Sequence, residues 1–334
     1  MVKTLLGQVK QYKKASLLTP LFTALEVVME VLIPLVISLI IDRGIEAGNI
    51  QQIYFYGGIM VIMAMASLIF GILAGKYAAS ASSGLACNLR EEMYGNIQRF
   101  SFSNIDKYST AVLVTRLTTD VTNVQNAYQM ILRMCTRAPL MLISAMVMCF
   151  LINTQLSLVF VAAIVVLGLS LALIILKTIK IFDQVFKKYD ALNESVQENV
   201  SAIRVVKAYV REDYENTRFT KAATNLYRFF VKAEGILAFN NPVMMFVIYG
   251  CILGISWLGA QMIIVGSLTT GELTAMFSYI MNIMMSLMML SMIFVMVTMS
   301  LASCRRITEV LEEQADIKDS ARPVTAVENG SIDF

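Results

Sequence analysis

Six long apolar stretches constrain this chain more than any other feature of its sequence. A helix needs about 20 consecutive apolar residues to cross the hydrocarbon core of a bilayer. Hydrophobic residues make up 57% of the chain and charged residues only 15%, whereas soluble domains carry roughly 25% charged residues. The sequence therefore predicts an all-α membrane protein with six transmembrane helices, at about residues 15–41, 53–74, 139–151, 156–176, 236–265 and 276–301, the third expected to begin earlier, near Tyr128.

Composition also argues against several functions. The net charge is only +3 and no basic block stands out, so nucleic acid is not an expected partner. The chain has no histidine, which is the commonest metal ligand and general base. Its five cysteines are scattered and form no C-x-x-C pair, which argues against a zinc site or a disulfide framework. We therefore expect no bound metal.

Positive charge is distributed very unevenly along the chain. Of the 27 Lys and Arg residues, 26 lie before the first stretch, in the connections after the second and fourth, or after the sixth. Because such charges mark the cytoplasmic face, both termini are expected in the cytoplasm, with the chain in the plasma (inner) membrane. Residues 1–14 mix apolar residues with four lysines, which predicts an amphipathic elbow helix on the membrane surface, with a frayed terminus as the alternative.

The two long connections, at about residues 75–138 and 177–236, have the periodicity of helices. In the second, apolar residues recur at steps of three and four, and no proline interrupts residues 140–241. Each connection is therefore predicted to form a long cytoplasmic helical hairpin, an arm that extends the transmembrane helices beside it. In the second arm the outgoing helix is expected to run to about Ala208, followed by a turn over residues 209–216. Such arms are either a stalk that supports the bundle or levers that transmit motion. The periodic residues of the second arm are Val185, Tyr189, Leu192, Val196, Val200 and Ile203.

Several motifs follow one another along the chain. They are residues 88–94 (NLREEMY), 97–102 (IQRFSF), 106–111 (DKYSTA) and 115–121 (TRLTTDV) in the first arm, 198–209 (ENVSAIRVVKAY) in the second, 266–275 (GSLTTGELTA) in the last external loop and 302–311 (ASCRRITEVL) at the end. In this order they resemble the membrane domain of ATP-binding-cassette (ABC) exporters of the multidrug and lipid-flippase type. The resemblance covers essentially the whole chain.

This resemblance implies a mechanism. Two such six-helix halves pair, as a homodimer or a heterodimer, and the tips of the arms act as coupling helices that dock into nucleotide-binding domains. ATP closes those domains, and the arms convert the closure into alternating access of the membrane cavity. On this sequence the coupling residues are Phe102, Ile105, Asp106, Lys107, Tyr209, Arg211, Glu212, Asp213 and Tyr214.

The sequence offers no phosphate-binding loop of the form G-x-x-x-x-G-K-[ST]. The nearest match, at residues 71–77, is one residue short, so Gly71 and Gly75 are interpreted as small residues at a helix contact. Residues 328–334 resemble the first strand of a nucleotide-binding domain. We therefore expect a six-helix domain at residues 15–310 and a linker at 311–334, with no catalytic residue or cofactor; ATP and magnesium would bind a nucleotide-binding domain that is missing here.

Acidic and methionine residues within the apolar stretches are candidates for contact with a substrate. Glu26 and Glu30 lie four apart on one helix face, and no Lys or Arg lies within the predicted spans to pair with them. They either bind a cationic or proton-coupled substrate, or form a hydrogen-bonded pair at a helix interface or in a wet cavity lining. A methionine stripe in the sixth stretch is either an adaptable substrate surface or packing filler; it includes Met285, Met288, Met292 and Met296.

We therefore predict the membrane-spanning half of an ATP-driven exporter that moves a hydrophobic or amphipathic drug, lipid or peptide out of the cytoplasm. Its expected partners are a second half-transporter, nucleotide-binding domains, the lipid bilayer and the substrate. Two alternatives stay open. One is half of an ion-coupled secondary transporter that uses Glu26 and Glu30, although such proteins usually have compact loops. The other is a membrane scaffold whose arms bind a cytoplasmic partner.

Overall fold

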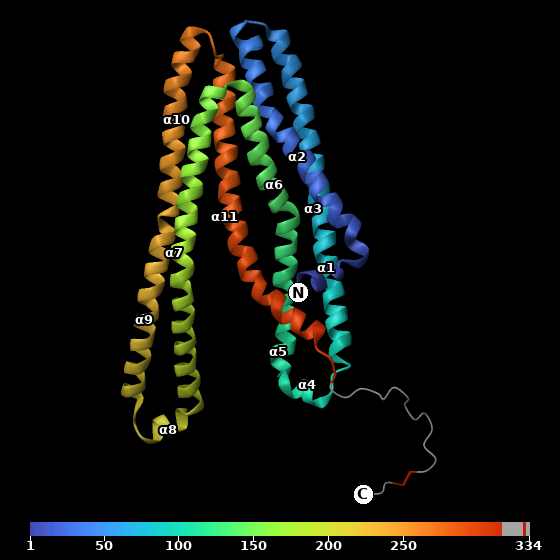
Figure 1. Cartoon of the computed structure of the whole chain (residues 1–334), viewed down its shortest axis with the longest axis vertical. Helices are drawn as coiled ribbons and strands as arrows, with labels where there is room; N and C mark the ends of the chain where they lie inside the picture. The colour runs from blue at the N-terminus through green and yellow to red at the C-terminus, as the bar shows by residue number, and fades with distance from the viewer. Residues whose placement is uncertain (316–329, 332–334) are drawn as a thin grey trace. The chain divides into compact units, whose positions relative to one another are not determined.

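The computed structural model describes residues 1–315 and 330–331, and within those residues every regular element is a helix (Figure 1). Six helical segments are long and apolar enough to cross a membrane, which confirms the six predicted spans. The longest helices have 48 residues each and so reach about 70 Å. The helices that contain the spans are α2 (Lys13–Ile40), α3 (Ile50–Ile97), α6 (Val121–Ile152), α7 (Thr154–Ser201), α10 (Asn240–Val265) and α11 (Thr270–Glu312).

Shorter elements build the N-terminus and turn the two arms. The first arm runs along α3, turns at α4 and returns through α5 into α6, while the second runs along α7, turns at α8 and returns along α9 into α10. These elements are α1 (Val2–Gly7), α4 (Phe102–Lys107), α5 (Thr110–Thr115), α8 (Ile203–Ala208) and α9 (Glu212–Ala238), with a 3-10 turn η1 (Lys10–Tyr12) and π-helical turns η2 (Ile41–Glu46) and η3 (Arg116–Asp120).

The second arm turns differently from the sequence-based expectation. A single helix was predicted to about Ala208, followed by a turn over residues 209–216. The structure ends α7 at Ser201 and places the short helix α8 before the turn. The next helix already begins at Glu212. Val210 has φ +52°, a left-handed conformation that is unfavourable for a β-branched residue, so this reversal is tight.

The chain packs as two compact units, and α2, α3, α6 and α11 each contribute to both. Unit 1 contains α1, α4, α5 and the adjoining parts of α2, α3, α6 and α11. Its core joins the N-terminus, the first arm and the end of α11, because Leu5 and Val9 are buried with Leu89, Met93 and Ile307. Unit 1 comprises Met1–Ile33, Gly57–Ser144 and Ser286–Phe334, and unit 2 comprises Pro34–Tyr56 and Ala145–Met285.

The elbow segment at the N-terminus therefore packs its apolar side on protein. Leu5 and Val9 are buried in the core of unit 1, whereas Leu6 on the other side of α1 is exposed. Lys10 forms an ion pair with Glu92 of α3 at 2.8 Å. These contacts attach the N-terminal segment to the first arm.

Unit 2 is built around α7, which packs along α9 and α10 (Figure 1). Local signals fix where its helices begin and end. Asn153 separates α6 from α7, and its side chain accepts hydrogen bonds from the backbone N–H groups of Gln155 and Leu156, as an N-cap does. Gly266, with φ +78°, ends α10 in the left-handed conformation that glycine adopts readily.

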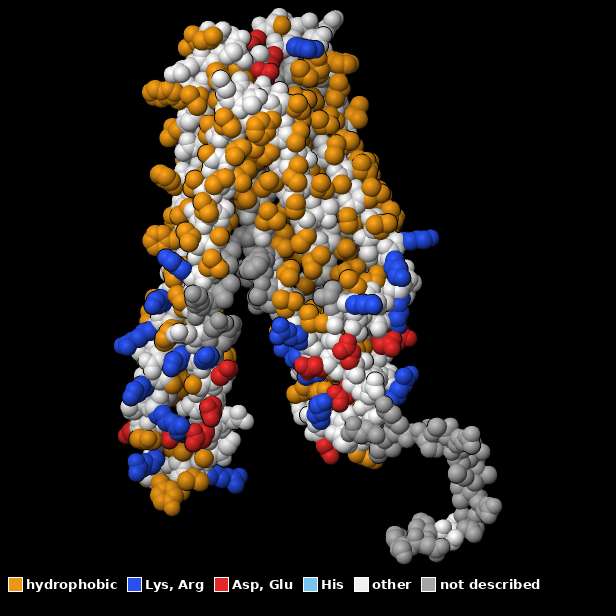
Figure 2. Space-filling model, in the orientation of Figure 1, with side chains coloured by type: hydrophobic (Ala, Val, Ile, Leu, Met, Phe, Trp, Pro, Cys, Tyr) orange, Lys and Arg blue, Asp and Glu red, His pale blue; other side chains and the backbone are white. Residues whose placement is uncertain are grey.

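Polar and apolar side chains divide along the helices (Figure 2). On the face shown, hydrophobic side chains cover the parts of the helices that contain the spans, while Lys, Arg, Asp and Glu gather toward the ends of the arms. This division is the one expected of helices that pass from lipid into water. The expected linker at 311–334, and the strand-like segment at its end, lie largely outside the described residues.

Candidate functional site

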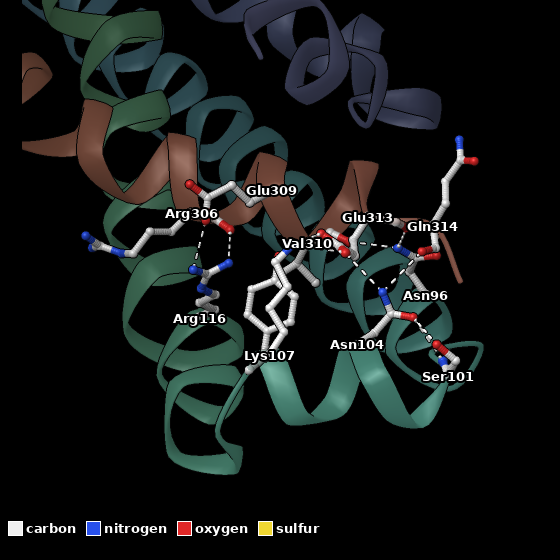
Figure 3. A network of polar contacts seen from close by, with 11 residues as sticks. Asn96, Ser101, Asn104, Lys107, Arg116, Arg306, Glu309, Val310, Glu313 and Gln314 are labelled. Carbon is white, nitrogen blue, oxygen red and sulfur yellow. Dashed lines mark hydrogen bonds and ion pairs between the residues drawn. The ribbon is translucent and has the colours of Figure 1, made fainter. Parts of the chain in front are cut away.

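The tip of the first arm is the short helix α4, from which Asn104 and Lys107 reach toward the end of α11 (Figure 3). Asn104 is buried, whereas Phe102 is 84% exposed and Ile105 is also exposed. The backbone N–H of Ser101 donates to Asn104 Oδ1 at 3.1 Å and so caps the start of the helix. The structure therefore presents two predicted coupling residues, Phe102 and Ile105, on the outer side of the tip.

Glu313, just after α11, is the centre of the contacts on the inner side of this tip (Figure 3). Its carboxylate accepts hydrogen bonds from Lys107 Nζ at 2.8 Å, Tyr108 OH at 2.9 Å and Asn104 Nδ2 at 3.0 Å. The hydrogen bonds from Lys107 and Tyr108 hold the pKa of the Glu313 carboxyl below its ordinary value of 4.5. The hydrogen bond to Glu313 in turn raises the pKa of Lys107.

Two asparagine side chains cap the end of α11. Asn96 Nδ2 donates to the carbonyl oxygens of Val310 at 2.7 Å and Glu313 at 2.9 Å, and Asn104 Nδ2 donates to that of Gln314 at 3.2 Å. The last carbonyl groups of a helix have no partner within it. Side chains of the first arm satisfy them here, so the arm determines where α11 ends.

Arginine side chains extend this attachment along α11. Arg116 donates to Glu309 Oε2 and to the carbonyl oxygen of Arg306, both at 2.9 Å. Asp120 pairs with Arg306, at 2.5 Å, and accepts a hydrogen bond from Ser303.

The acidic pair of the first span lies in an ion-pair site within unit 1. Arg137 Nη1 donates to Glu26 Oε1 at 2.6 Å, and Arg137 Nη2 donates to the two oxygens of Glu30 at 2.8 and 2.7 Å. The expectation that no cation lies within a span is therefore wrong. The third span as drawn from Pro139 left out Arg137, whereas its expected earlier start near Tyr128 includes it, and α6 indeed continues through both residues.

A glycine of α3 makes room for this site. A Cβ added at Gly71 would lie 3.1 Å from Glu26 Oε1, and one added at Gly75 would lie 3.8 Å from Arg133 Nη1. Gly71 and Gly75 thus face charged side chains of α2 and α6, which refines their interpretation as small residues at a helix contact.

Comparison with known proteins identifies the family. Residues 17–288 match the family model described as ABC transporter transmembrane region. The chain belongs to this family of ABC transporter membrane domains. The matched range runs from α2 into α11 and includes both arms, so the resemblance in the sequence motifs is confirmed.

The relatives of this ABC transporter membrane domain are longer than the chain. It is 34% identical over 293 residues to the uncharacterized ABC transporter ATP-binding protein YfiB of Bacillus subtilis, across 88% of this chain and 51% of that protein. It is 26% identical to the ATP-dependent lipid A-core flippase of Desulfotalea psychrophila, across 70% and 41%. It is 25% identical to the probable multidrug resistance ABC transporter ATP-binding/permease protein YheI of Bacillus subtilis, across 84% and 48%. The chain thus spans about half the length of the relatives it matches.

The second arm of this ABC transporter membrane domain ends in an exposed aromatic turn. Tyr209, Val210 and Tyr214 are 76%, 81% and 58% exposed. Arg211 lies over the ring of Tyr214, 5.6 Å from its centre. Lys207 and Glu212 form an ion pair across the turn at 2.9 Å, and Asp213 is exposed beside it. The predicted coupling residues therefore lie together on the surface of this tip.

The methionine stripe of the sixth span lies on one side of α11. Met285, Met288 and Met292 are exposed, Met296 is half-buried, and Met284 on another side of the helix is buried. This placement shows an accessible row of thioether side chains. Whether a substrate contacts them remains a prediction, as it does for Glu26 and Glu30.

Sequence reasoning missed three residues on which these sites depend, namely Arg137, Asn104 and Glu313. Arg137 follows Arg133 by one helical turn, before Pro139 in a helix that tolerates the proline, and that pair was a usable signal. Asn104 three residues after Ser101 was a capping signal for α4. Glu313 had no local signal, because its partners are about 205 residues away in the sequence.

Proposed function

We propose that the chain is the membrane-spanning half of an ATP-driven exporter that works by alternating access. The observation that carries this proposal is the construction of the first tip in an ABC transporter membrane domain. Its inner side is bonded to the end of α11, while Phe102 and Ile105 on its outer side are exposed. An exposed apolar anchor on a firmly held helix suits docking into a groove of a partner.

The proposed partners are a second half-transporter and nucleotide-binding domains. The relatives named as ATP-binding proteins are about twice as long as the matched region, which supports an ATP-binding part attached to or associated with this domain. ATP and magnesium would be held there. The arms would transmit closure of the nucleotide-binding domains to the six spans.

The proposed substrate class is a hydrophobic or amphipathic compound. A lipid A-core flippase and a probable multidrug resistance transporter are among the relatives, and the first of these names specifies a lipid. The exposed methionines on α11 offer the polarizable, adaptable surface that such compounds favour.

Transport by the complete transporter reconstituted in liposomes tests the proposal. A fluorescent amphipathic compound should cross the membrane only when ATP and magnesium are supplied, and transport should persist when ion gradients are collapsed by ionophores. ADP serves as the control for nucleotide binding without hydrolysis. Transport that ignores ATP but stops with the ion gradient would show that the chain works as a secondary transporter.

Sidedness has its own test, because the proposal places both arms in the cytoplasm. The charged ends of the arms support this orientation. A cysteine introduced by Asp213→Cys, in a variant lacking the native cysteines, should react with a membrane-impermeant maleimide only after the cells are opened. A matched Asn49→Cys variant, in the loop before α3, should react in intact cells. The reverse labelling pattern would show that the arms lie outside the cell and that the proposed orientation is wrong.

A further inference from the structure

The ion-pair site of α2 and α6 is incompletely satisfied. Among the described residues, one cation, Arg137, pairs with two carboxylates, those of Glu26 and Glu30. Glu26 is 7% exposed, and its Oε2 is buried without a hydrogen-bond partner among the described residues. An unpaired buried polar or charged group is costly. The site can therefore bind one more positively charged group, at Glu26 Oε2.

Arg133 is a cation one helical turn away. Across the described residues it has no hydrogen bond or ion pair, unlike Arg137. Positions 133 and 137 are neighbours on the surface of α6, about 6 Å apart along it. A metal ion is a poor candidate for the partner of Glu26 Oε2, because no group of three or more His, Cys, Asp or Glu side chains is placed to hold one in the described part of the chain.

The spacing of charges and glycines matches on three helices. Glu26 and Glu30 are four residues apart on α2, and Arg133 and Arg137 are four apart on α6, which crosses the membrane in the same direction as the first and third of six spans. On α3, Gly71 lies against Glu26 and Gly75 lies against Arg133. Each glycine leaves room for a charged side chain, so Glu26 and Arg133 lie against positions one helical turn apart on the same face of α3.

We propose that Arg133 is the alternate partner of Glu26. In the described arrangement both carboxylates bind Arg137 and Arg133 lies over Gly75. In the alternate arrangement the guanidinium group of Arg133 moves from Gly75 toward Gly71 and binds Glu26. Arg137 keeps its two hydrogen bonds to Glu30. Two carboxylates then face two guanidinium groups, so the site is neutral and the orphan oxygen of Glu26 gains a donor. This exchange goes beyond the proposed function and does not depend on it.

The two arrangements join the same helices, α2 and α6, but through different pairs. In the described one, Arg137 alone joins Glu26 and Glu30 to α6. In the alternate one, two separate pairs join α2 and α6 at successive turns. Buried charge networks of this kind have discrete arrangements rather than a continuum. The site is thus a two-state element inside the spans.

Zero-length cross-linking tests the exchange without any measurement of transport. In an Arg133→Lys variant, treatment with the membrane-permeant reagent dicyclohexylcarbodiimide converts a carboxyl group and an adjacent amine to an amide, while the reagent takes up water and leaves as a urea. We expect a peptide pair joined between position 133 and Glu26, detected by mass spectrometry. The product should be lost in an Arg133→Lys, Glu26→Gln variant and retained in an Arg133→Lys, Glu30→Gln variant.

Two controls make the result decisive. An Arg137→Lys variant should give amides to both Glu26 and Glu30, which shows that the reagent reaches the site. Native Lys76, on α3 beside Gly75 but exposed, should give none. If position 137 cross-links and position 133 does not, or if position 133 joins only Glu30, Arg133 is not the alternate partner of Glu26.

Discussion

Arg137 is the residue on which the buried charges of α2 depend. It makes three short hydrogen bonds to Glu26 and Glu30, and in an apolar environment such charges persist only when they are paired. The sequence identified the two carboxylates as unusual because they interrupt an apolar run. It could not identify their partner, because pairing depends on how α6 packs against α2 and on a helix that continues past Pro139.

Loss of Arg137 should destabilise the domain strongly. Arg137→Gln leaves two carboxylates without their cation, and breaking a buried pair from one side typically costs about 3–5 kcal/mol. Thermal unfolding of the purified domain in nanodiscs measures the effect. Arg137→Lys keeps the positive charge but cannot bond both carboxylates with a planar guanidinium group, so its unfolding midpoint should fall less than that of Arg137→Gln. An unfolding midpoint for Arg137→Gln equal to that of the original chain would contradict the ion-pair assignment.

Gly71 should be intolerant of even one added carbon. A Cβ there would approach Glu26 Oε1 to 3.1 Å and its Cδ to 3.3 Å, so in Gly71→Ala the Glu26 carboxyl must shift by a few tenths of an ångström, against the ion pair that holds it to Arg137. We expect a loss of about 1–3 kcal/mol, as for other overpacked sites. Gly58→Ala is the matched control on the same helix, where a Cβ meets nothing within 4 Å and alanine should stabilise by about 0.5–1 kcal/mol. Equal effects of the two substitutions would argue against a special role for Gly71.

At the scale of elements, the arms were predictable and their tips only partly so. The helical periodicity of residues 185–203 and the absence of proline fixed the long helices. The helix α4 coincides with the predicted first tip. The break at Ala202 and the helix α8 were missed, because no glycine or proline marks them and the conformation of Val210 is imposed by the hairpin. Acidic residues in the first turn of α9, beginning with Glu212, were a start signal that could have shortened the predicted turn.

The attachment of α11 to the first arm should weaken in acid. The pKa of Glu313 is lowered in the folded chain, so its carboxylate stabilises the attachment above the unfolded pKa, and this contribution is lost as the pH falls through the lowered value, below 4.5. Spin labels at Phe102→Cys and Arg305→Cys should show a broader distance distribution at acidic pH. In a Glu313→Gln background the distribution should be insensitive to this change. A distance distribution that becomes narrower at acidic pH would contradict the stabilising role of the ionised Glu313 carboxylate.

At the scale of the whole molecule, the sequence predicted the number of spans and the family, and the structure adds how the parts connect. Composition and length suffice for six spans, because crossing a bilayer sets a minimum apolar length. The division into two units, with α2, α3, α6 and α11 shared between them, had no signal in the sequence. It arises from long-range packing, such as that of Leu5 and Val9 on the first arm and the end of α11.

The proposed function requires that the arms couple nucleotide-binding domains to the spans, and the second tip allows a direct test of this coupling. In the reconstituted complete transporter, Tyr209→Ala combined with Tyr214→Ala removes two exposed aromatic anchors from the second tip. Loss of such anchors typically costs about 1–4 kcal/mol of docking free energy. Transport per ATP hydrolysed should fall, while folding and substrate binding stay nearly intact. Tyr227→Ala, an equally exposed tyrosine farther along α9, is the control. If the double variant transports at the original rate with normal substrate-stimulated ATP hydrolysis, the tip does not couple the two processes.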